Sequence, residues 1–273
     1  MNDGEPQITE PAPLPTPIYK YIELECGSNV ARLTLNRPPY NVLTIDMMQE
    51  MTRAIESLHD QYEVRVILIQ ASPACKAFSA GVAVEDSRPD RVFQMLEAFQ
   101  SVFHSMLEIS KPVVTVVNGP AIGGGCELAA LADMILATPK ARFAQPEIKL
   151  GVFPPMAAII LPHVIGHRRA LEMILTGDPL TAEEAQRLGL VNRVVPETQL
   201  DEEVEKILAK VAAQSTPVLE MAKKVLYDTI GLPLADAIKK SSDIYLNQLM
   251  DLDDAREGLL AMIEKRKPVW KNR

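Results

Sequence analysis

The residues in this chain best suited to chemistry are three consecutive glycines, Gly123 to Gly125, followed closely by Glu127. Consecutive glycines let a ligand approach the main chain closely. A helix that begins there points its unpaired N–H groups at that ligand. A phosphate site would have Lys and Ser or Thr at this point, so the carboxylate favours handling a proton or a water beside a developing oxyanion. A tight strand-to-helix turn with a solvated Glu127 is the open alternative.

Two further segments could join this site. Ser79 to Val82 is a loop of small residues that follows an apolar strand, and it offers another free backbone N–H. Glu147 comes twenty residues after Glu127, just beyond the next predicted strand. Two N–H donors from separate loops can form an oxyanion hole, and two carboxylates can share a water. Glu147 also follows a proline at a helix start, so a helix cap is the competing interpretation.

Other candidate groups give weaker evidence for a catalytic or metal site. His163 and His167 are spaced i, i+4 but lack the glutamate of a zinc-binding H-E-x-x-H sequence, and no metal site is predicted. Ser79 has no base partner visible in the sequence, which argues against a nucleophilic triad. Glu85 and Asp86 follow the small-residue loop, and we expect them to form a solvated edge.

An alternating α/β pattern is expected to position these residues. Strands at residues 18–24 and 30–35, with turn residues between them, predict a hairpin. Thr44 is the predicted N-cap of a helix that runs to about His59, and Thr181 to Glu184 form a capping box. Further elements are predicted as strands at 64–69, 113–117, 134–137 and 190–195 and a helix at 90–109. Such α/β sheets bind ligands at the carboxyl ends of their strands.

Composition narrows the class of protein. The 273 residues suffice for one large domain or a domain with an appendage. A net charge of −8 argues against a nucleic-acid surface, and no apolar run reaches the ~18 residues of a membrane span. Three widely spaced cysteines fit free thiols in a reducing compartment. Residues 1–17 are acidic and Pro-rich, unlike a signal or transit peptide, so we expect a disordered arm on a cytoplasmic protein.

Four motifs together resemble one known family. They are F-S-A-G (78–81), K-P-V-V-T-V-V-N-G-P-A-I-G-G-G-C-E-L-A (111–129), A-R-F-A-Q-P-E-I-K-L-G (141–151) and T-G-D-P-L-T-A-E-E-A-Q-R-L-G-L-V-N-R-V-V-P (176–196). In order and spacing they are similar to the enoyl-CoA hydratase/isomerase (crotonase) superfamily. The resemblance implies an α/β fold, a crotonase-type spiral of ββα/βαβ units over residues 18–197. A helical region for trimerisation would then follow at 198–273.

The resemblance also implies roles for particular residues. The family binds acyl-CoA thioesters, with coenzyme A as part of the substrate and no separate cofactor. The two N–H groups that hold the thioester oxygen correspond to Val82 and Gly124. Hydratases of the family use two glutamates, which correspond to Glu127 and Glu147. We assign Glu127 to activating the water and Glu147 to delivering the proton, with sharing of both tasks as the alternative. The expected substrate-binding residues are Lys76, Ser79, Ala80, Gly81, Gly123, Pro155 and Met156. Homotrimers or pairs of trimers are implied, with no nucleic-acid or membrane partner.

The sequence departs from the family pattern at two places. The familiar A-G-x-D loop reads Ala80-Gly81-Val82-Ala83, and a usually glycine-rich segment reads Phe-Pro-Pro-Met-Ala-Ala at 153–158. These changes indicate a reshaped acyl pocket. The two altered segments are similar to those of hydratases that act on cyclic dienoyl-CoA in anaerobic aromatic degradation. A double-bond isomerase that uses Glu147 as its shuttle, or a non-catalytic CoA-binding scaffold, are the alternatives.

The last nine residues are rich in cations, and they could contact the CoA of a neighbouring subunit or serve solubility alone. These are Lys265, Arg266, Lys267, Lys271 and Arg273.

Overall fold

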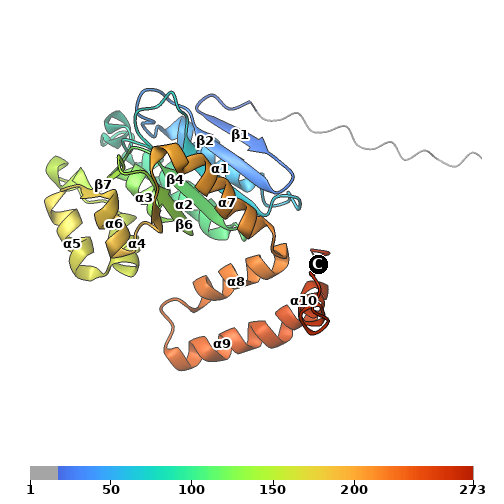
Figure 1. The fold of residues 1–273 in the computed structure, drawn as a ribbon. Helices are drawn as coiled ribbons and strands as arrows, with labels where there is room; N and C mark the ends of the chain where they lie inside the picture. The colour runs from blue at the N-terminus through green and yellow to red at the C-terminus, as the bar shows by residue number, and fades with distance from the viewer. Residues whose placement is uncertain (1–17, 273) are drawn as a thin grey trace, which may run out of the picture.

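The computed structural model describes residues 18–272, so the predicted N-terminal arm lies outside the described residues (Figure 1). Its main sheet has six strands in the order β1-β2-β3-β4-β6-β9. β1 and β2 form the predicted antiparallel hairpin, and the other neighbours pair in parallel. The strands are β1 (Ile22–Cys26), β2 (Val30–Leu35), β3 (Val66–Ala71), β4 (Val113–Val117), β6 (Met134–Ala137) and β9 (Arg193–Val194).

Helices cover both faces of this sheet. In β3, Ile67 and Ile69 pack into one apolar cluster, which includes α1 (Ile45–Glu56) and α2 (Val92–Glu108). Val66 and Leu68 point to the other face, against α7 (Leu200–Ala212). This two-sided burial explains why the central strands are continuous apolar runs. The remaining core helices are α3 (Gly124–Ala130), α4 (Ala157–Ile165), α5 (His167–Thr176) and α6 (Ala182–Leu188).

Two predicted caps are confirmed. The Thr44 hydroxyl accepts the Met47 N–H at the start of α1. Thr181 and Glu184 form a reciprocal capping box at the start of α6.

Two predicted strands were drawn too long. The N–H groups of Lys20 and Tyr21 donate to the Glu50 carboxylate of α1, so the first strand begins only at Ile22. Near the last strand, the N–H groups of Leu190 and Val191 donate to the carbonyl of Ala185 and close α6. Hydrogen bonds to a helix therefore replaced strand pairing at both places.

A second, small sheet was not predicted. It contains β5 (Pro120–Ile122), β7 (Arg142–Ala144) and β8 (Leu180–Thr181) in the order β5-β7-β8. The sequence indicated a turn where β5 lies, because a three-residue strand shows no periodicity. β5 pairs in parallel with β7, which brings the glycine run beside the segment that carries Glu147.

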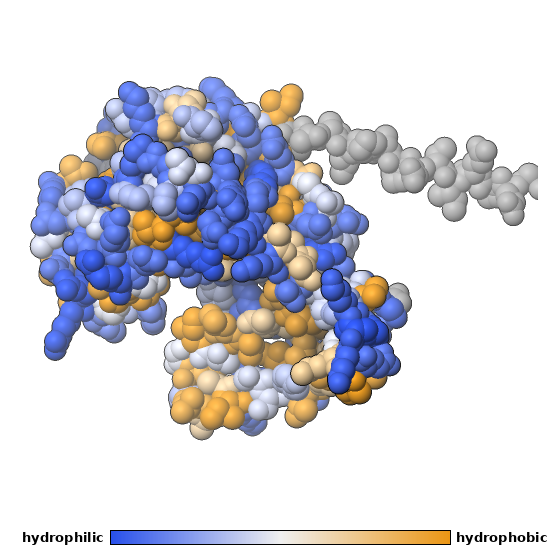
Figure 2. Space-filling view, viewed as in Figure 1, coloured by the Kyte–Doolittle hydropathy of each residue, from blue (hydrophilic) through white to orange (hydrophobic). Residues whose placement is uncertain are grey.

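Beyond α7 the chain is helical, as predicted, with α8 (Thr216–Thr229), α9 (Leu234–Asn247) and α10 (Asp253–Ile263). α8 and α9 extend away from the sheet (Figure 1), and apolar side chains gather on this extension (Figure 2). Among residues 18–272, no helix is both long and apolar enough to cross a membrane.

Candidate active site

Two loops meet at the glycine run. Ser79 and Ala121 form a parallel bridge, in which the Ser79 N–H donates to the Pro120 carbonyl and the Ile122 N–H to the Ser79 carbonyl. Gly81 has a φ of +89°, and a Cβ there would lie 2.8 Å from the Ile122 carbonyl oxygen. Only glycine fits that position without strain.

The N–H groups of Val82 and Gly124 lie on these two loops. A Cβ on Gly124 would lie 2.9 Å from Cγ2 of Val82, so the two residues are in direct contact. Among the hydrogen bonds of residues 18–272, neither N–H donates to a protein acceptor. On either side of Val82, the Gly81 N–H donates to Ser79 Oγ and the Ala83 N–H donates to the Leu43 carbonyl. Before Gly124, the Gly123 N–H donates to the Ala144 carbonyl. Two adjacent unpaired donors are suited to one oxygen atom of a ligand.

Glu127 lies in the first turn of α3 and is only 2% exposed. Its Oε1 accepts the N–H groups of Met156 at 2.9 Å and Ala157 at 2.7 Å. Burial raises the pKa of Glu127 to about 7, helped by the negative charge of Glu147 and opposed by the two N–H donors. The carboxyl group can therefore gain or lose a proton near neutral pH.

Glu147 lies in a short 3-10 turn, Pro146–Leu150, directly after β7. Its carboxylate reaches back to the glycine run, where a Cβ on Gly123 would collide with Oε1. Its Oε2 is buried and accepts no hydrogen bond from residues 18–272. Burial raises the pKa of this group too, and the group's own backbone N–H opposes the shift. Both predicted carboxylates thus lie beside the same glycines.

The remaining predicted site residues have different surroundings. Ser79 is fully buried, and its hydroxyl donates to the Asn41 carbonyl at 2.7 Å and accepts the Gly81 N–H, so it supports the loop. Lys76 and Ala80 are exposed beside that loop. Pro155 and Met156 are half-buried where the chain passes Glu127.

One expectation about this region was wrong. Asp86 was expected on a solvated edge, but it is 5% exposed and bonds to the Ile45 N–H and to Arg91. Its carboxylate ties the loop to the start of α1. Glu85, by contrast, is exposed.

Sequence reasoning missed two residues that shape the site. Asn41 is buried, and its side-chain amide donates to the carbonyls of Ala77 and Phe78. It has a φ of +48°, a conformation that Asn tolerates, and the breaker-rich N-R-P-P-Y-N segment was the available signal. Phe99 of α2 lies 3.1 Å from the Cβ position of Gly124, and no local signal marks it.

One cation of the basic C-terminal segment, Arg266, is paired with carboxylates of the same chain. Arg266 forms a two-pronged ion pair with Glu257 and a further one with Glu264 at 2.6 Å. Lys265, Lys267 and Lys271 are exposed, and Arg273 lies outside the described residues. Arg266 is therefore held in place by α10 and the turn that follows it.

These features define a class of protein before any comparison. It is an α/β fold with helices at its C-terminus, in which two carboxylates lie beside a pair of unpaired main-chain donors. Such a site can move protons next to an oxygen that becomes negative. Among residues 18–272, no cluster of His, Cys, Asp and Glu has the composition of a metal site.

Comparison with known proteins gives the family. Residues 25–273 match the enoyl-CoA hydratase/isomerase family model, and the chain belongs to that family. A probable mitochondrial enoyl-CoA hydratase of Dictyostelium discoideum is 37% identical over 91% of this chain and 90% of its own. A probable enoyl-CoA hydratase of Rhizobium meliloti is 35% identical over 93% of this chain and 99% of its own.

Solved structures confirm the predicted fold. The crystal structure of an enoyl-CoA hydratase from Mycobacterium smegmatis superposes with a TM-score of 0.87 at 31% identity. The match covers 92% of this chain and 99% of that one. The chain therefore has the crotonase-type α/β fold with C-terminal helices.

Proposed function

We propose that this protein adds water to the conjugated double bond of an acyl-CoA thioester, as a hydro-lyase. The observation that carries the proposal is the placement of two carboxylates beside the same glycine run, that of the buried Glu127 and that of the half-buried Glu147. A scaffold that only binds CoA has no use for two carboxylates withdrawn from water beside the glycines, because the withdrawal of a charged group from water is costly. The relatives named as enoyl-CoA hydratases support the same reaction.

The proposed reaction begins with the thioester oxygen accepting hydrogen bonds from the N–H groups of Val82 and Gly124. Glu127 takes a proton from water while the water oxygen bonds to the β-carbon. The electron pair of the double bond moves toward the carbonyl, and the two N–H groups stabilise the resulting enolate oxygen. Protonated Glu147 then gives its proton to the α-carbon. Proton transfer from Glu127 restores Glu147, so the net change is the addition of one water.

The surroundings of the two carboxylates support this assignment of Glu127 as the base and Glu147 as the acid. Glu127 Oε1 is fixed by two N–H donors, which hold the carboxylate in one orientation for a water. Glu147 Oε2 is buried without a hydrogen-bond partner among residues 18–272, and burial raises the pKa of this carboxyl group. The two glutamates could also share both tasks.

We further propose that the acyl group is a cyclic dienoyl unit, because the segment over Glu127 replaces the family's glycines with Pro154, Pro155 and Met156. Pro154 is buried and Met156 donates its N–H to Glu127, so this segment is rigid and close to the reacting carbons.

A substrate panel tests both levels of the proposal. Crotonyl-CoA and cyclohexa-1,5-diene-1-carbonyl-CoA would be followed by loss of thioester-conjugation absorbance, with products identified by mass. Water added to the diene but not to crotonyl-CoA supports the cyclic substrate. Hydration of crotonyl-CoA with an inert diene rejects the cyclic substrate and keeps the hydratase. A product of unchanged mass indicates an isomerase using Glu147, and binding without any product indicates a scaffold.

We also propose that the chain self-associates as a homotrimer or hexamer through its C-terminal helices. Apolar side chains there are strongly exposed in the single chain, among them Leu234, Leu246, Met262 and Ile263 at 65–82%. Exposed apolar area of this kind marks an interaction surface. Light scattering after size exclusion would give the copy number. A cytoplasmic location stays a prediction.

A further inference from the structure

A third carboxylate, that of Asp86, is buried close to the loop that carries the Val82 N–H. Asp86 lies in a 3-10 turn, Val84–Ser87, and is 5% exposed. Its Oδ2 accepts the Ile45 N–H at 3.2 Å, and its Oδ1 pairs with Arg91 at 3.0 Å. A charged group is costly to bury unless it is paired and hydrogen-bonded. None of the mechanistic steps proposed above uses this carboxylate.

The direction of the Val82 N–H depends on the segment around Leu43. The Gly81 carbonyl belongs to the same peptide unit as the Val82 N–H, and it accepts the Leu43 N–H at 2.8 Å. In a planar trans peptide the carbonyl and the N–H point in opposite directions, so the Val82 N–H points away from Leu43. The Ala83 N–H donates to the Leu43 carbonyl at 2.9 Å and completes the parallel bridge of Leu43 with Val82. A shift of Leu43 would therefore turn the Val82 N–H.

Asp86 holds the same segment at a third point. Ile45 is the first residue of α1 and lies two residues after Leu43, and its N–H is one that a helix leaves unpaired at its start. The Asp86 carboxylate accepts that N–H at the positive end of the helix dipole, which also favours a negative charge. Residues 81–86 are thus bonded to residues 43–45 at both ends, and the contact at Asp86 is made by a side chain.

The ion pair of Asp86 leads toward the second unpaired N–H, that of Gly124. Arg91 directly precedes α2, and α2 carries Phe99, which lies 3.1 Å from the Cβ position of Gly124. One carboxylate therefore connects the start of α1, the start of α2 and the loop that contains Val82.

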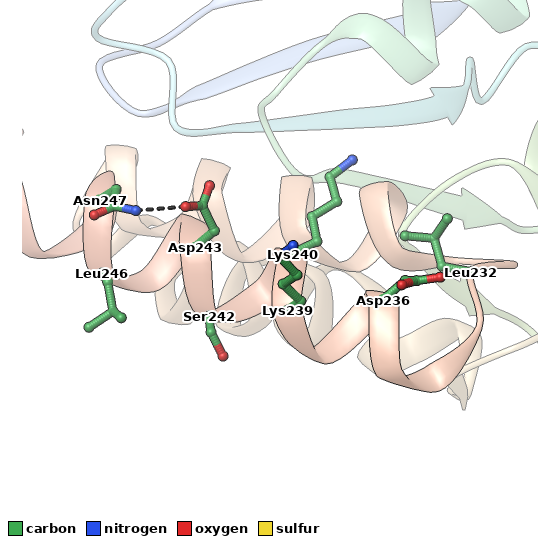
Figure 3. A pocket seen from close by; sticks show the side chains of 8 residues that line it. All are labelled: Leu232, Asp236, Lys239, Lys240, Ser242, Asp243, Leu246 and Asn247. Carbon is green, nitrogen blue, oxygen red and sulfur yellow. Dashed lines mark hydrogen bonds between the residues drawn. The ribbon is translucent and has the colours of Figure 1, made fainter.

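Another carboxylate at a helix start shows a different environment. Asp236 lies in the first turn of α9 and is exposed. It lines a hollow of about 560 Å³ whose eight lining residues all belong to positions 232–247 (Figure 3). The burial of Asp86 and its bond to a distant segment are therefore not general features of a carboxylate at a helix start.

We propose that Asp86 is a positioning residue for the hydration: its carboxylate holds the loop of Val82 against the start of α1 and so directs the Val82 N–H to the thioester oxygen. This inference rests on the proposed hydratase function and adds to it a residue that acts through Val82 without touching the substrate. The carboxylate of the A-G-x-D pattern is absent at Ala83, and Asp86 is the buried carboxylate of this loop.

Two substitutions remove the contact from its two sides. Asp86→Ala removes the acceptor, and Ile45→Pro removes the donated N–H. Proline is tolerated at the first position of a helix, and Thr44 before it is already extended, with a ψ of 162°. Asp86→Asn is the conservative variant, because it keeps an oxygen that can accept the Ile45 N–H. Glu85→Ala is the matched control, since Glu85 is exposed in the same 3-10 turn.

Two measurements separate the direction of the N–H from the stability of the fold. Steady-state kinetics with the substrate identified by the panel give kcat and KM. Infrared difference spectra of bound butanoyl-CoA and cyclohexanecarbonyl-CoA, labelled with ¹³C at the thioester carbonyl, give the carbonyl stretching frequency. That frequency falls as the carbonyl accepts stronger hydrogen bonds. Urea unfolding and the stoichiometry of binding by calorimetry measure how much of each variant is folded.

We expect Asp86→Ala and Ile45→Pro each to lower kcat by about 10–100-fold and to change KM by less than about threefold, since misplacement of a group by about 1 Å costs up to ~10²-fold. This loss is smaller than the ~10²–10³-fold that removal of a whole donor costs. The carbonyl frequency should rise in both variants, and Asp86→Asn should recover most of both effects. The double variant should be no slower than the worse single variant, because both changes remove one contact. Glu85→Ala should match the parent protein.

Folded variants that keep the carbonyl frequency of the parent would show that Asp86 serves stability alone, and the inference would be wrong. Effects on kcat that multiply in the double variant would contradict it as well. If Asp86→Ala does not fold, Ile45→Pro and Asp86→Asn give the same comparison. If the parent hydrates no substrate, the proposed function fails, and the carbonyl frequencies of the two bound saturated thioesters still decide the inference.

Discussion

The Cβ position of Gly125 lies 2.6 Å from both Cβ and the carbonyl oxygen of Ser79. The first turn of α3 and the loop before Val82 are therefore packed without room for a methyl group. This close approach sets the distance between the two unpaired N–H groups, of Val82 and Gly124. The glycine run is required for packing as well as for access to the main chain.

Gly125→Ala should destabilise the protein and displace the Ser79 loop. Overpacking of a tight contact costs about 1–3 kcal/mol of the free energy of unfolding. Because the displaced loop carries Val82, kcat should fall more than affinity for acyl-CoA. Urea unfolding and steady-state kinetics would measure the two effects.

Gly27→Ala is the control for that substitution. A Cβ on Gly27 would meet its nearest neighbour, the Val30 carbonyl oxygen, at an ordinary 3.5 Å. Its stability should stay close to that of the parent protein. Equal stability of the two variants would contradict the packing argument.

Most features that could be predicted from the sequence depend on residues that are close together in the chain. The Thr44 cap, the capping box at Thr181 and strands β2, β4 and β6 follow from neighbouring residues, and the structure confirms them. The glycine run and Glu127 likewise stand together in the chain. Glu147 could be placed near them because strand-end loops of one α/β fold gather at one edge.

Contacts between distant segments could not be predicted in the same way. The β5–β7 pair, which draws Glu147 to Gly123, consists of two three-residue strands without periodicity. Asp86 looked like a loop carboxylate, and besides the nearby Arg91 its partner is the Ile45 N–H, 41 residues away in the chain. The partners of Asp133 come from α8, far along the sequence.

Glu127→Gln should abolish most of the turnover and leave substrate affinity nearly intact. Gln can still accept the N–H groups of Met156 and Ala157 through its Oε1, but it cannot take a proton from water. Loss of a general base lowers rates by about 10²–10⁴-fold. Stopped assays with mass detection would measure kcat, and calorimetry would measure binding of a saturated acyl-CoA.

Glu108→Gln serves as the control, since Glu108 is exposed at the end of α2. It should retain the kinetics of the parent protein. Unchanged turnover in Glu127→Gln would remove Glu127 from the proposed mechanism.

Two adjacent lysines of α8 should differ in their effect on stability. Lys223 pairs with Asp133 where the side chains are only 10% and 17% exposed, and it also donates to the Lys111 carbonyl. Lys223→Met leaves the Asp133 carboxylate without its cation, and we expect a loss of about 1.5–3 kcal/mol, typical of hydrogen bonds to charged groups. Lys224 pairs with Asp228 at 49% and 30% exposure, so Lys224→Met should cost below about 1 kcal/mol.

Chemical unfolding at fixed protein concentration would compare these two variants. A similar small loss in both would show that the contacts of Asp133 with Lys223 and Tyr227 do not fix α8 to the core. The comparison is matched because both variants replace a lysine by an uncharged side chain of similar length, at neighbouring positions of one helix.

The raised pKa of Glu127 predicts a pH dependence of activity. With a pKa of about 7, the carboxylate needed as the base is lost as pH falls below neutrality. We expect kcat/KM to fall about tenfold for each pH unit well below 7. A profile that stays flat down to pH 5.5 would show that a different group takes the proton.

The same shift predicts that stability falls as pH rises from about 4.5 to about 7. In this window folded Glu127 keeps a proton that the unfolded chain has lost, because its pKa is about 7 in the folded protein against an ordinary 4.5. Across this pH window the free energy of unfolding should fall by about 3 kcal/mol, because each unit of pKa difference corresponds to about 1.4 kcal/mol. Glu127→Gln removes the titrating group, so its stability relative to the parent should rise by an amount of this order between pH 4.5 and 7.5. Urea unfolding of both proteins at the two pH values measures that difference. If the difference does not change with pH, the pKa of Glu127 is the same in the folded and unfolded protein, which contradicts the prediction.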